Sequence, residues 1–187
     1  MKKLSKIWIL FVGIALVFLS YILDMQAENF FKTLRTPLLD ATLGIITNFG
    51  VVVLFMVIVP TIILYKKNKK IISLLWINFF ISLAATFILK LVIARQRPVE
   101  AFTYPFSTII NYSFPSMHAV VAFSLMAMLN ENMPKQKNFW NAFACLVALS
   151  RLYFGVHYLS DVVSGALIGY FIGHYLSFLY KKYGKNK

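Results

Sequence analysis

The sequence is poor in charge: only 13 % of its 187 residues are Asp, Glu, Lys or Arg, whereas 60 % are hydrophobic. A soluble domain carries about 25 % charged residues, so the composition argues against a soluble globular protein. Long apolar runs dominate instead, and they predict an integral membrane protein of the helical type. The length fits one compact domain over residues 1–187.

Cysteine and acidic residues are scarce as well. The single cysteine, Cys145, cannot form an intramolecular disulfide, and we expect it to be a small core residue because it lies inside an apolar run. Only six Asp and Glu accompany three His, whereas two-metal phosphatases need several carboxylates. We therefore expect neither a metal site nor a cofactor.

Lysine and arginine are abundant by contrast and give a formal net charge of +13. Thirteen of the 19 basic residues lie in four short stretches between every second pair of apolar runs, which is the positive-inside pattern. This pattern explains the charge without a basic groove for nucleic acid, so we expect membrane lipids as partners, no nucleic acid and no obligatory protein. The stretches are Lys2–Lys6, Lys66–Lys70, Lys135–Lys137 and Lys181–Lys187.

Six apolar runs predict an all-α bundle of six transmembrane helices, with both termini in the cytoplasm because the lysine-rich stretches lie inside. A cleaved signal peptide ending near Ala27 is the alternative for the first run. Residues 23–44 are predicted to be either a helix at the membrane interface or an exposed connector. The runs are Ile7–Ile22, Ile45–Tyr65, Ile71–Ile93, Ser116–Asn130, Phe139–Val156 and Tyr158–Tyr180.

A small set of polar residues remains within or beside these runs once the inner lysines are set aside. Ionisable groups are costly in a membrane, so each is a functional candidate. Because odd runs lead outward and even runs lead inward, all of them lie at the outer face. They are Lys90, Arg95, Arg97, Ser116, His118, Arg151, His157 and Asp161.

These residue types suit phosphoryl transfer. Arginine offers a planar fork of donors for phosphate oxygens, and Ser116 begins a helix whose free N–H groups favour an anion. Two histidines provide a nucleophile and a proton donor. Asp161, four residues after His157 on one helical face, can accept a proton from one ring nitrogen and leave the other as an attacking lone pair.

Three segments carry a family resemblance. KLVIARQRP (Lys90–Pro98), PSMH (Pro115–His118) and SRLYFGVHYLSD (Ser150–Asp161) resemble the three signature motifs of the type-2 phosphatidic acid phosphatase superfamily, in order and with matching spacing. Those motifs read lysine, six residues, Arg-Pro; Pro-Ser-Gly-His; and Ser-Arg, five residues, histidine, three residues, aspartate. The resemblance covers the whole chain and implies the six-helix layout with an outer loop between the first two motifs.

The resemblance implies a phosphate-binding role for Lys90, Arg97 and Arg151, helped by Ser116 and neighbouring N–H groups. Met117 departs from the pattern, because the family has glycine at this position. A methionine would be strained if the position required a positive φ. We expect instead that its N–H faces the phosphate and that its side chain points toward lipid or a groove for the substrate's tail.

The resemblance also implies the catalytic roles. His157 would attack phosphorus to form a phosphohistidine, and Asp161 would orient it. His118 would protonate the leaving oxygen and then activate the water that clears the intermediate, with no metal required. Arg95 matches no motif position and is predicted to be interfacial.

A stripe of glycines follows the histidine–aspartate pair along the last apolar run. Gly165, Gly169 and Gly173 recur every four residues, a spacing that lets another helix approach closely. The stripe continues the face that carries His157 and Asp161. We therefore predict packing inside the bundle rather than a dimer contact.

These inferences predict a membrane lipid phosphatase of the bacterial inner membrane with its site on the outer side. Candidate substrates are undecaprenyl diphosphate, phosphatidylglycerol phosphate and phosphatidic acid, with lipid A as a further possibility. The enzymatic alternative is a lipid phosphotransferase that uses the same site. The alternative without catalysis is a transporter or receptor of lipid phosphates.

Overall fold

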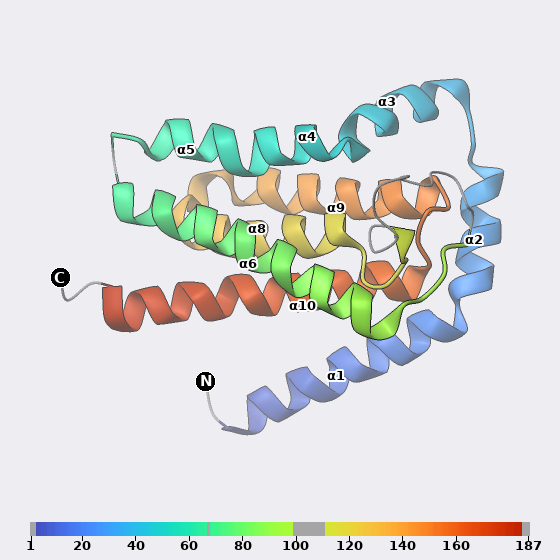
Figure 1. Cartoon of the computed structure of the whole chain (residues 1–187), viewed down its shortest axis with the longest axis horizontal. Helices are drawn as coiled ribbons and strands as arrows, with labels where there is room; N and C mark the ends of the chain where they lie inside the picture. Colours follow the sequence, from blue (N-terminus) through green and yellow to red (C-terminus); the bar gives the residue numbers. More distant parts are fainter. Residues whose placement is uncertain (1–2, 67, 99–110, 185–187) are drawn as a thin grey trace.

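The computed structural model describes residues 3–66, 68–98 and 111–184, and every regular element in these ranges is a helix (Figure 1). The predicted all-α class is therefore confirmed. Much of the predicted outer loop, residues 99–110, lies outside the described ranges. The elements are α1 (Lys3–Ile22), α2 (Asp24–Thr33), α3 (Pro37–Thr47), α4 (Phe49–Val53), a π-helical turn (Leu54–Ile58), α5 (Val59–Leu64), α6 (Lys69–Ile93), α8 (Met117–Asn132), a 3-10 turn (Pro134–Gln136), α9 (Lys137–Tyr153), α10 (Leu159–Leu179) and a second π-helical turn (Tyr180–Gly184).

Helix α8 forms the centre of the bundle and packs against α6, α9 and α10 (Figure 1). It begins after Pro115 and ends just before Pro134, because proline disfavours a helical conformation in the residue that precedes it. Between Ala119 and Leu129 nearly every side chain is buried. A helix that is apolar on all sides belongs in the interior, so α8 serves as the fixed element around which the others pack.

The three glycines of α10 allow its backbone to touch that of α8. A Cβ atom added to Gly169 would lie 2.2 Å from the Val120 carbonyl oxygen, and one added to Gly173 would lie 2.1 Å from the Ser124 carbonyl oxygen. Any larger residue would force the helices apart. The predicted packing inside the bundle is confirmed, and it fixes α8 and α10, which both lead to the site, relative to each other.

The second apolar run, predicted to be one helix, is broken at Asn48. Helix α3 ends at Thr47, and the side chain of Asn48 caps α4 by accepting the Gly50 N–H at 2.9 Å. The chain bends by 54° at this break. An asparagine can offer the backbone a local hydrogen bond that competes with the continuous helix. The π-helical turn Leu54–Ile58 then precedes a proline, which has no N–H to donate.

The connection 23–44 forms two helices, α2 and most of α3, and α2 leaves α1 at an angle of 62°. Among the described residues, α6 and the segment Leu159–Tyr183 are each long and apolar enough to cross a bilayer, and the number rises to four if each bent pair is one span. Helices α8 and α9, with 16 and 17 residues, fall short of the about 20 that a full crossing needs. The count of six spans remains a prediction.

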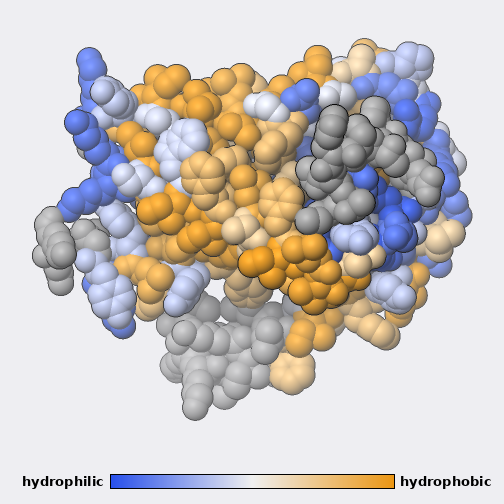
Figure 2. Space-filling model, viewed as in Figure 1, coloured by the Kyte–Doolittle hydropathy of each residue, from blue (hydrophilic) through white to orange (hydrophobic). Residues whose placement is uncertain are grey.

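The surface carries an apolar belt between two hydrophilic ends, as the face in Figure 2 shows. Both chain ends lie toward the same end of the bundle as the turn between α5 and α6 (Figure 1). Cys145 is exposed, so the expectation of a core residue was wrong. It lies on the side of α9 opposite the stripe formed by Trp140, Ala144 and Val147, which faces the core.

Candidate active site

The predicted site residues lie where α6 and α9 end and where α8 and α10 begin, which is the end of the bundle away from the turn between α5 and α6 (Figure 1). Lys90 lies in the last turn of α6 and Arg151 in the last turn of α9. His118 is the second residue of α8, and Asp161 is the third residue of α10. His157 lies in the short link between α9 and α10. Residues from four separate segments thus meet at one place, as the alternating directions of the predicted runs required.

His157 is buried, with only 4 % of its surface exposed. Its ring interacts electrostatically with the positive charges of Arg151, Arg97 and Lys90. Burial, together with these charges, holds the pKa of His157 well below its ordinary value, because both disfavour the imidazolium form. The ring is therefore neutral at neutral pH, and a neutral imidazole nitrogen has the lone pair that a nucleophile needs.

Lys90, Arg97 and Arg151 form what we call the cation cluster. Lys90 is almost completely buried, at 1 % exposure, so it does not extend to the interface as an isolated lysine would. The three side chains donate hydrogen bonds to carbonyl and hydroxyl oxygens, which orient the three cations. The acceptors are the Tyr112 carbonyl for Lys90, the Asn111 and Val156 carbonyls at 2.9 and 3.1 Å for Arg97, and the Thr47 hydroxyl for Arg151.

Asp161 is completely buried and lies beside the ring of His157. Its Oδ2 atom is 3.7 Å from His157 Nδ1, which is longer than a hydrogen bond. The same oxygen accepts the Ser113 hydroxyl and, at 2.9 Å, the Tyr158 N–H. The Ser113 hydroxyl in turn lies 3.4 Å from His157 Nδ1. The predicted pair is thus assembled around a shared serine, and such contacts commonly shorten when substrate binds.

The beginning of α8 partly matches the prediction. Ser116 is at the N-cap position but makes no capping bond with its side chain, and its N–H donates to the Asp161 carbonyl at 3.1 Å. Its hydroxyl and His118 Nε2 are buried without a hydrogen-bond partner in the described part of the chain. Met117 has a helical conformation, so the absence of glycine causes no strain there. Its side chain packs against the core rather than pointing toward lipid.

Sequence reasoning missed a cluster on the other side of Asp161, formed by Asp24, Arg95 and Ser160, which we call the rear cluster. Arg95, expected to be interfacial, donates to Asp161 Oδ1 at 2.8 Å, to Asp24 Oδ2 at 2.8 Å and to the Ser160 hydroxyl at 2.7 Å. Asp24 also accepts the N–H and the hydroxyl of Ser160 at 2.8 and 2.7 Å. The expectation for Arg95 was wrong, because the side chain turns inward to meet two carboxylates.

One sequence signal could have drawn attention to Asp24. It follows the first apolar run directly, and an acidic residue at the end of such a run deserves the same scrutiny as the other ionisable groups. No sequence feature indicated its partner, since Asp24 and Arg95 are separated by 71 positions.

In the ranges that the structure describes, no three His, Cys, Asp or Glu side chains gather in a way that could hold a metal ion. The charged groups nearest His157 are the cation cluster and Asp161. A cluster of cations repels a divalent ion and attracts an anion. The arrangement is suited to binding phosphate oxygens directly.

Two solved structures share this architecture. A transmembrane phosphatidylglycerolphosphate phosphatase of the PAP2 type from Bacillus subtilis superimposes with a TM-score of 0.69 at 22 % identity, over 91 % of this chain and 96 % of the other. LpxE from Aquifex aeolicus gives a TM-score of 0.67 at 26 % identity, over 82 % and 94 %. The fold and the site together define a membrane lipid phosphatase.

Similarity at the level of sequence gives the family. The chain is 29 % identical over 139 residues to an undecaprenyl-diphosphatase of Sulfolobus acidocaldarius, covering 72 % of this chain and 67 % of the relative. It is 30 % identical over 185 residues to a lipid A 4'-phosphatase of Porphyromonas gingivalis, covering 88 % and 75 %. The model of the PAP2 superfamily matches residues 70–185. The chain belongs to the PAP2 superfamily, which confirms the resemblance that its three motifs carry.

Proposed function

We propose that this enzyme removes a phosphate group from a lipid phosphomonoester or diphosphate at the outer face of the bacterial cell membrane, through a phosphohistidine. The observation that carries the proposal is the meeting of His157, His118 and the cation cluster at one end of the bundle. Positive charges that lie around a neutral histidine suit attack on an anionic phosphorus centre, because they stabilise the charge on its oxygens.

In the first half-reaction, Nε2 of His157 attacks phosphorus while the bond from phosphorus to the leaving oxygen breaks. His118 gives its proton to that oxygen, which departs as a lipid alcohol or, from a diphosphate, as a lipid monophosphate. In the second half-reaction, His118 takes a proton from water, the water oxygen attacks phosphorus, and the nitrogen–phosphorus bond breaks to release phosphate. Asp161 keeps the ring of His157 oriented in both steps.

The cation cluster would bind the non-bridging oxygens of the phosphate. The hydroxyl of Ser116 and Nε2 of His118, both buried and without a partner in the described ranges, support the same assignment, because buried polar atoms are rarely left unpaired. The N–H groups of Met117 and its neighbours in the first turn of α8 would add donors at the positive end of the helix dipole.

Several lipids fit this chemistry, and a direct comparison is the test that separates them. The purified protein in lipid nanodiscs is given undecaprenyl diphosphate, phosphatidylglycerol phosphate, phosphatidic acid and a 4'-phosphorylated lipid A, and phosphate release is measured with and without EDTA. We expect turnover of at least one lipid, unaffected by the chelator. Glycerol phosphate formed in added glycerol would indicate a phosphotransferase. Binding without turnover would indicate a transporter or receptor and would refute the proposal.

The covalent intermediate is tested with His157→Ala. Acid-labile, base-stable labelling from a substrate with radioactive phosphate is expected in the wild-type chain and absent from the variant, whose turnover should fall to background. His118→Ala should still form some phosphoenzyme, because its main loss lies in proton transfer. More than a few per cent of wild-type activity in His157→Ala would contradict the mechanism.

The proposed orientation has six membrane crossings, both termini in the cytoplasm and the site outside. Support comes from the lysine-rich turn between α5 and α6, which lies at the end of the bundle away from the site (Figure 1). In a Cys145→Ala background, Asn29→Cys on α2 and Lys66→Cys near that turn are exposed to a membrane-impermeant thiol reagent on intact cells. Labelling of Asn29→Cys alone is expected. Labelling of Lys66→Cys alone would indicate the opposite orientation, with the site in the cytoplasm.

A further inference from the structure

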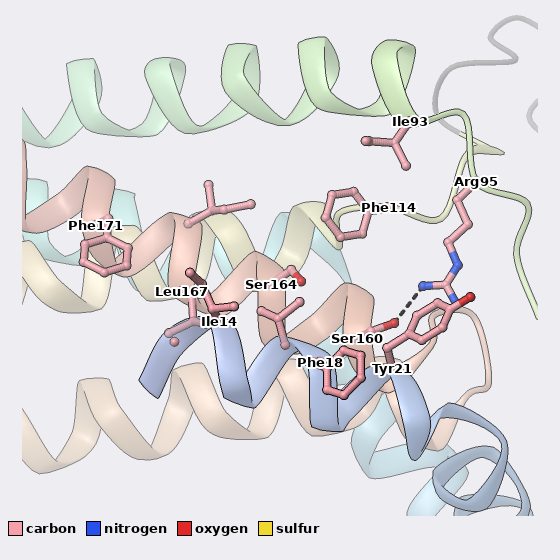
Figure 3. Close-up of a pocket in the computed structure, with 13 residues that line it drawn as sticks. Ile14, Phe18, Tyr21, Ile93, Arg95, Phe114, Ser160, Ser164, Leu167 and Phe171 are labelled. Atoms are coloured by element: carbon pink, nitrogen blue, oxygen red, sulfur yellow. Dashed lines mark hydrogen bonds between the residues drawn. The ribbon is translucent and has the colours of Figure 1, made fainter. Parts of the chain in front are cut away.

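Arg95 bridges two carboxylates that come from opposite ends of the sequence. Its Nη1 donates to Asp161 Oδ1 and its Nη2 to Asp24 Oδ2, each at 2.8 Å. The guanidinium also lies 4.0 Å from the ring centre of Tyr158 and 5.6 Å from that of Tyr21. Figure 3 shows Arg95 reaching toward Ser160, with Tyr21 beside it. The side chain is therefore fixed from several directions.

These charges lie in an apolar setting. Asp161 and Asp24 are 0 % and 5 % exposed. Arg95 and Ser160 lie at one end of an apolar cleft of about 710 Å³ between α1 and α10, lined by residues such as Phe18 and Leu167 (Figure 3). Buried ion pairs seldom add net stability, because desolvation offsets their attraction. Stability alone is therefore a weak reason for this chain to place three charged groups here.

The contacts of Asp161 indicate what the bridge does. Its Oδ2 atom faces His157 and is held by the Ser113 hydroxyl and the Tyr158 N–H. Its Oδ1 atom is held by Arg95. With both oxygens held, the plane of the carboxylate is fixed. Without Arg95, the carboxylate could rotate and present a different edge to the imidazole.

We propose that Asp24 and Arg95 are positioning residues for the nucleophile: Asp24 fixes Arg95, Arg95 fixes the Asp161 carboxylate, and Asp161 orients His157. The inference rests on the phosphohistidine mechanism proposed above. It assigns a catalytic purpose to the bend between α1 and α2, because Asp24 is the first residue after that bend. The start of α2 thereby contributes to a site whose motif residues all lie further along the chain.

The test measures kcat and KM for Asp24→Asn, Arg95→Gln and the double variant in nanodiscs, with the lipid phosphate that the wild type hydrolyses fastest. Rates are divided by the amount of protein that elutes as one folded species in size-exclusion chromatography, so that unfolded protein does not count. We expect kcat to fall about ten- to a hundredfold, the loss that is typical when a group that orients a metal ligand is removed. KM and the inhibition constant of vanadate should stay the same, because the cation cluster is intact. The double variant should lose no more than Arg95→Gln alone, because the two residues act in series.

Asp24→Glu should recover part of the rate, since it keeps the carboxylate. Arg35→Gln is the matched control: it removes another arginine that pairs with an aspartate, Asp40 at 2.9 Å, but in an exposed position, and its kcat should stay within about twofold of the wild type. Where Asp24→Asn does not fold, Ser160→Ala replaces it, because that hydroxyl joins Arg95 to Asp24.

Three outcomes would overturn the inference: a kcat within about twofold of the wild type in the rear-cluster variants, additive losses in the double variant, or a loss confined to KM. Each of these presupposes a wild-type chain that forms the phosphoenzyme. A wild-type chain that hydrolyses no lipid phosphate and traps no phosphoenzyme would instead refute the proposed function itself.

Discussion

The cation cluster and the rear cluster both lie beside the histidine–aspartate pair, but their cations contact different kinds of groups. In the cation cluster, carbonyl and hydroxyl oxygens accept hydrogen bonds from three cations and orient them close to one another. In the rear cluster, Arg95 meets the carboxylates of Asp24 and Asp161 at 2.8 Å, so its charge is both oriented and compensated. The first arrangement keeps an electrostatic attraction for a substrate, whereas the second keeps its geometry with or without one.

This contrast teaches how one end of a bundle can be both reactive and ordered. A group of like charges in an apolar setting is unfavourable until an anion binds, and a catalytic site commonly carries such a cost to stability. A compensated network carries less of that cost and can hold a side chain still. The contrast makes opposite predictions for the two clusters, and four experiments test it.

The largest effect is expected on catalysis. Arg151→Gln should lower kcat/KM about 10²–10³-fold, because a preorganised donor to the transferring phosphoryl group is lost. Arg151→Lys should lie in between, since it keeps the charge but not the planar fork. The measurement is steady-state phosphate release at a fixed detergent-to-lipid ratio. Equal activity of the glutamine variant and the wild type would remove Arg151 from the proposed phosphate site.

The second effect concerns stability, and its sign should differ between the clusters. Lys90→Met should stabilise the folded chain by about 1–3 kcal/mol, because a buried ammonium is replaced by an apolar side chain of similar length. Asp24→Asn should destabilise it by about 1–3 kcal/mol, since Arg95 keeps one carboxylate partner instead of two. Thermal unfolding of both variants in the same detergent gives the comparison. If the unfolding temperature shifted in the same direction in both variants, the two clusters would not differ in their effect on stability.

The third effect is on the titration of His157. Removing a positive neighbour favours the imidazolium, so Arg151→Gln should raise the pKa of His157 toward its ordinary value, while burial still holds it lower. Asp24→Asn should leave it nearly unchanged. The chain has three histidines, so ¹³C-labelled imidazole resonances can be assigned by substituting each in turn. An unchanged titration in Arg151→Gln would show that the charge of Arg151 does not lower this pKa.

The smallest effect is the response to inorganic phosphate. At a free concentration three times its Kd, phosphate should stabilise the wild-type chain by about 0.8 kcal/mol, seen as a higher unfolding temperature. Asp24→Asn should keep this response, because the cation cluster is untouched, whereas Arg151→Gln should lose most of it. Sodium sulfate and sodium chloride at matched ionic strength serve as controls for general salt effects. Loss of the response in both variants would mean that phosphate binding at the cation cluster depends on the rear cluster.

The cation cluster could be predicted from the sequence, and the rear cluster could not. Lys90, Arg151 and His157 belong to local patterns with fixed spacing, and the alternating direction of the apolar runs brings their helix ends to one face. Asp24 lies at the 62° bend between α1 and α2, and it meets Arg95 through the packing of segments 71 positions apart. An angle between helices depends on packing, which the spacing of apolar residues does not encode.

The departures at α3 and α8 have a similar origin. In the second apolar run, Asn48 causes the break through a local capping bond. An average hydropathy over the run does not show the effect of one such residue. Ser116 was correctly placed at a helix start, but its N–H donates to the Asp161 carbonyl, a contact between residues 45 positions apart. In both cases the sequence predicted the type of secondary structure but not the partner in a particular hydrogen bond.

The contact between α8 and α10 also constrains how this chain can evolve. A clash with a side chain can be relieved by a second mutation that shortens that side chain, but Gly169 and Gly173 face carbonyl oxygens of Val120 and Ser124, which every amino acid possesses. A genetic selection that starts from Gly169→Ala should therefore recover reversion to glycine and no compensating replacement on α8. Gly165 is constrained in the same way, because a Cβ atom there would lie 2.9 Å from the Ser116 carbonyl oxygen as well as 3.1 Å from the Ala119 methyl group. At all three glycines, therefore, a shorter side chain on α8 cannot compensate for a larger residue on α10.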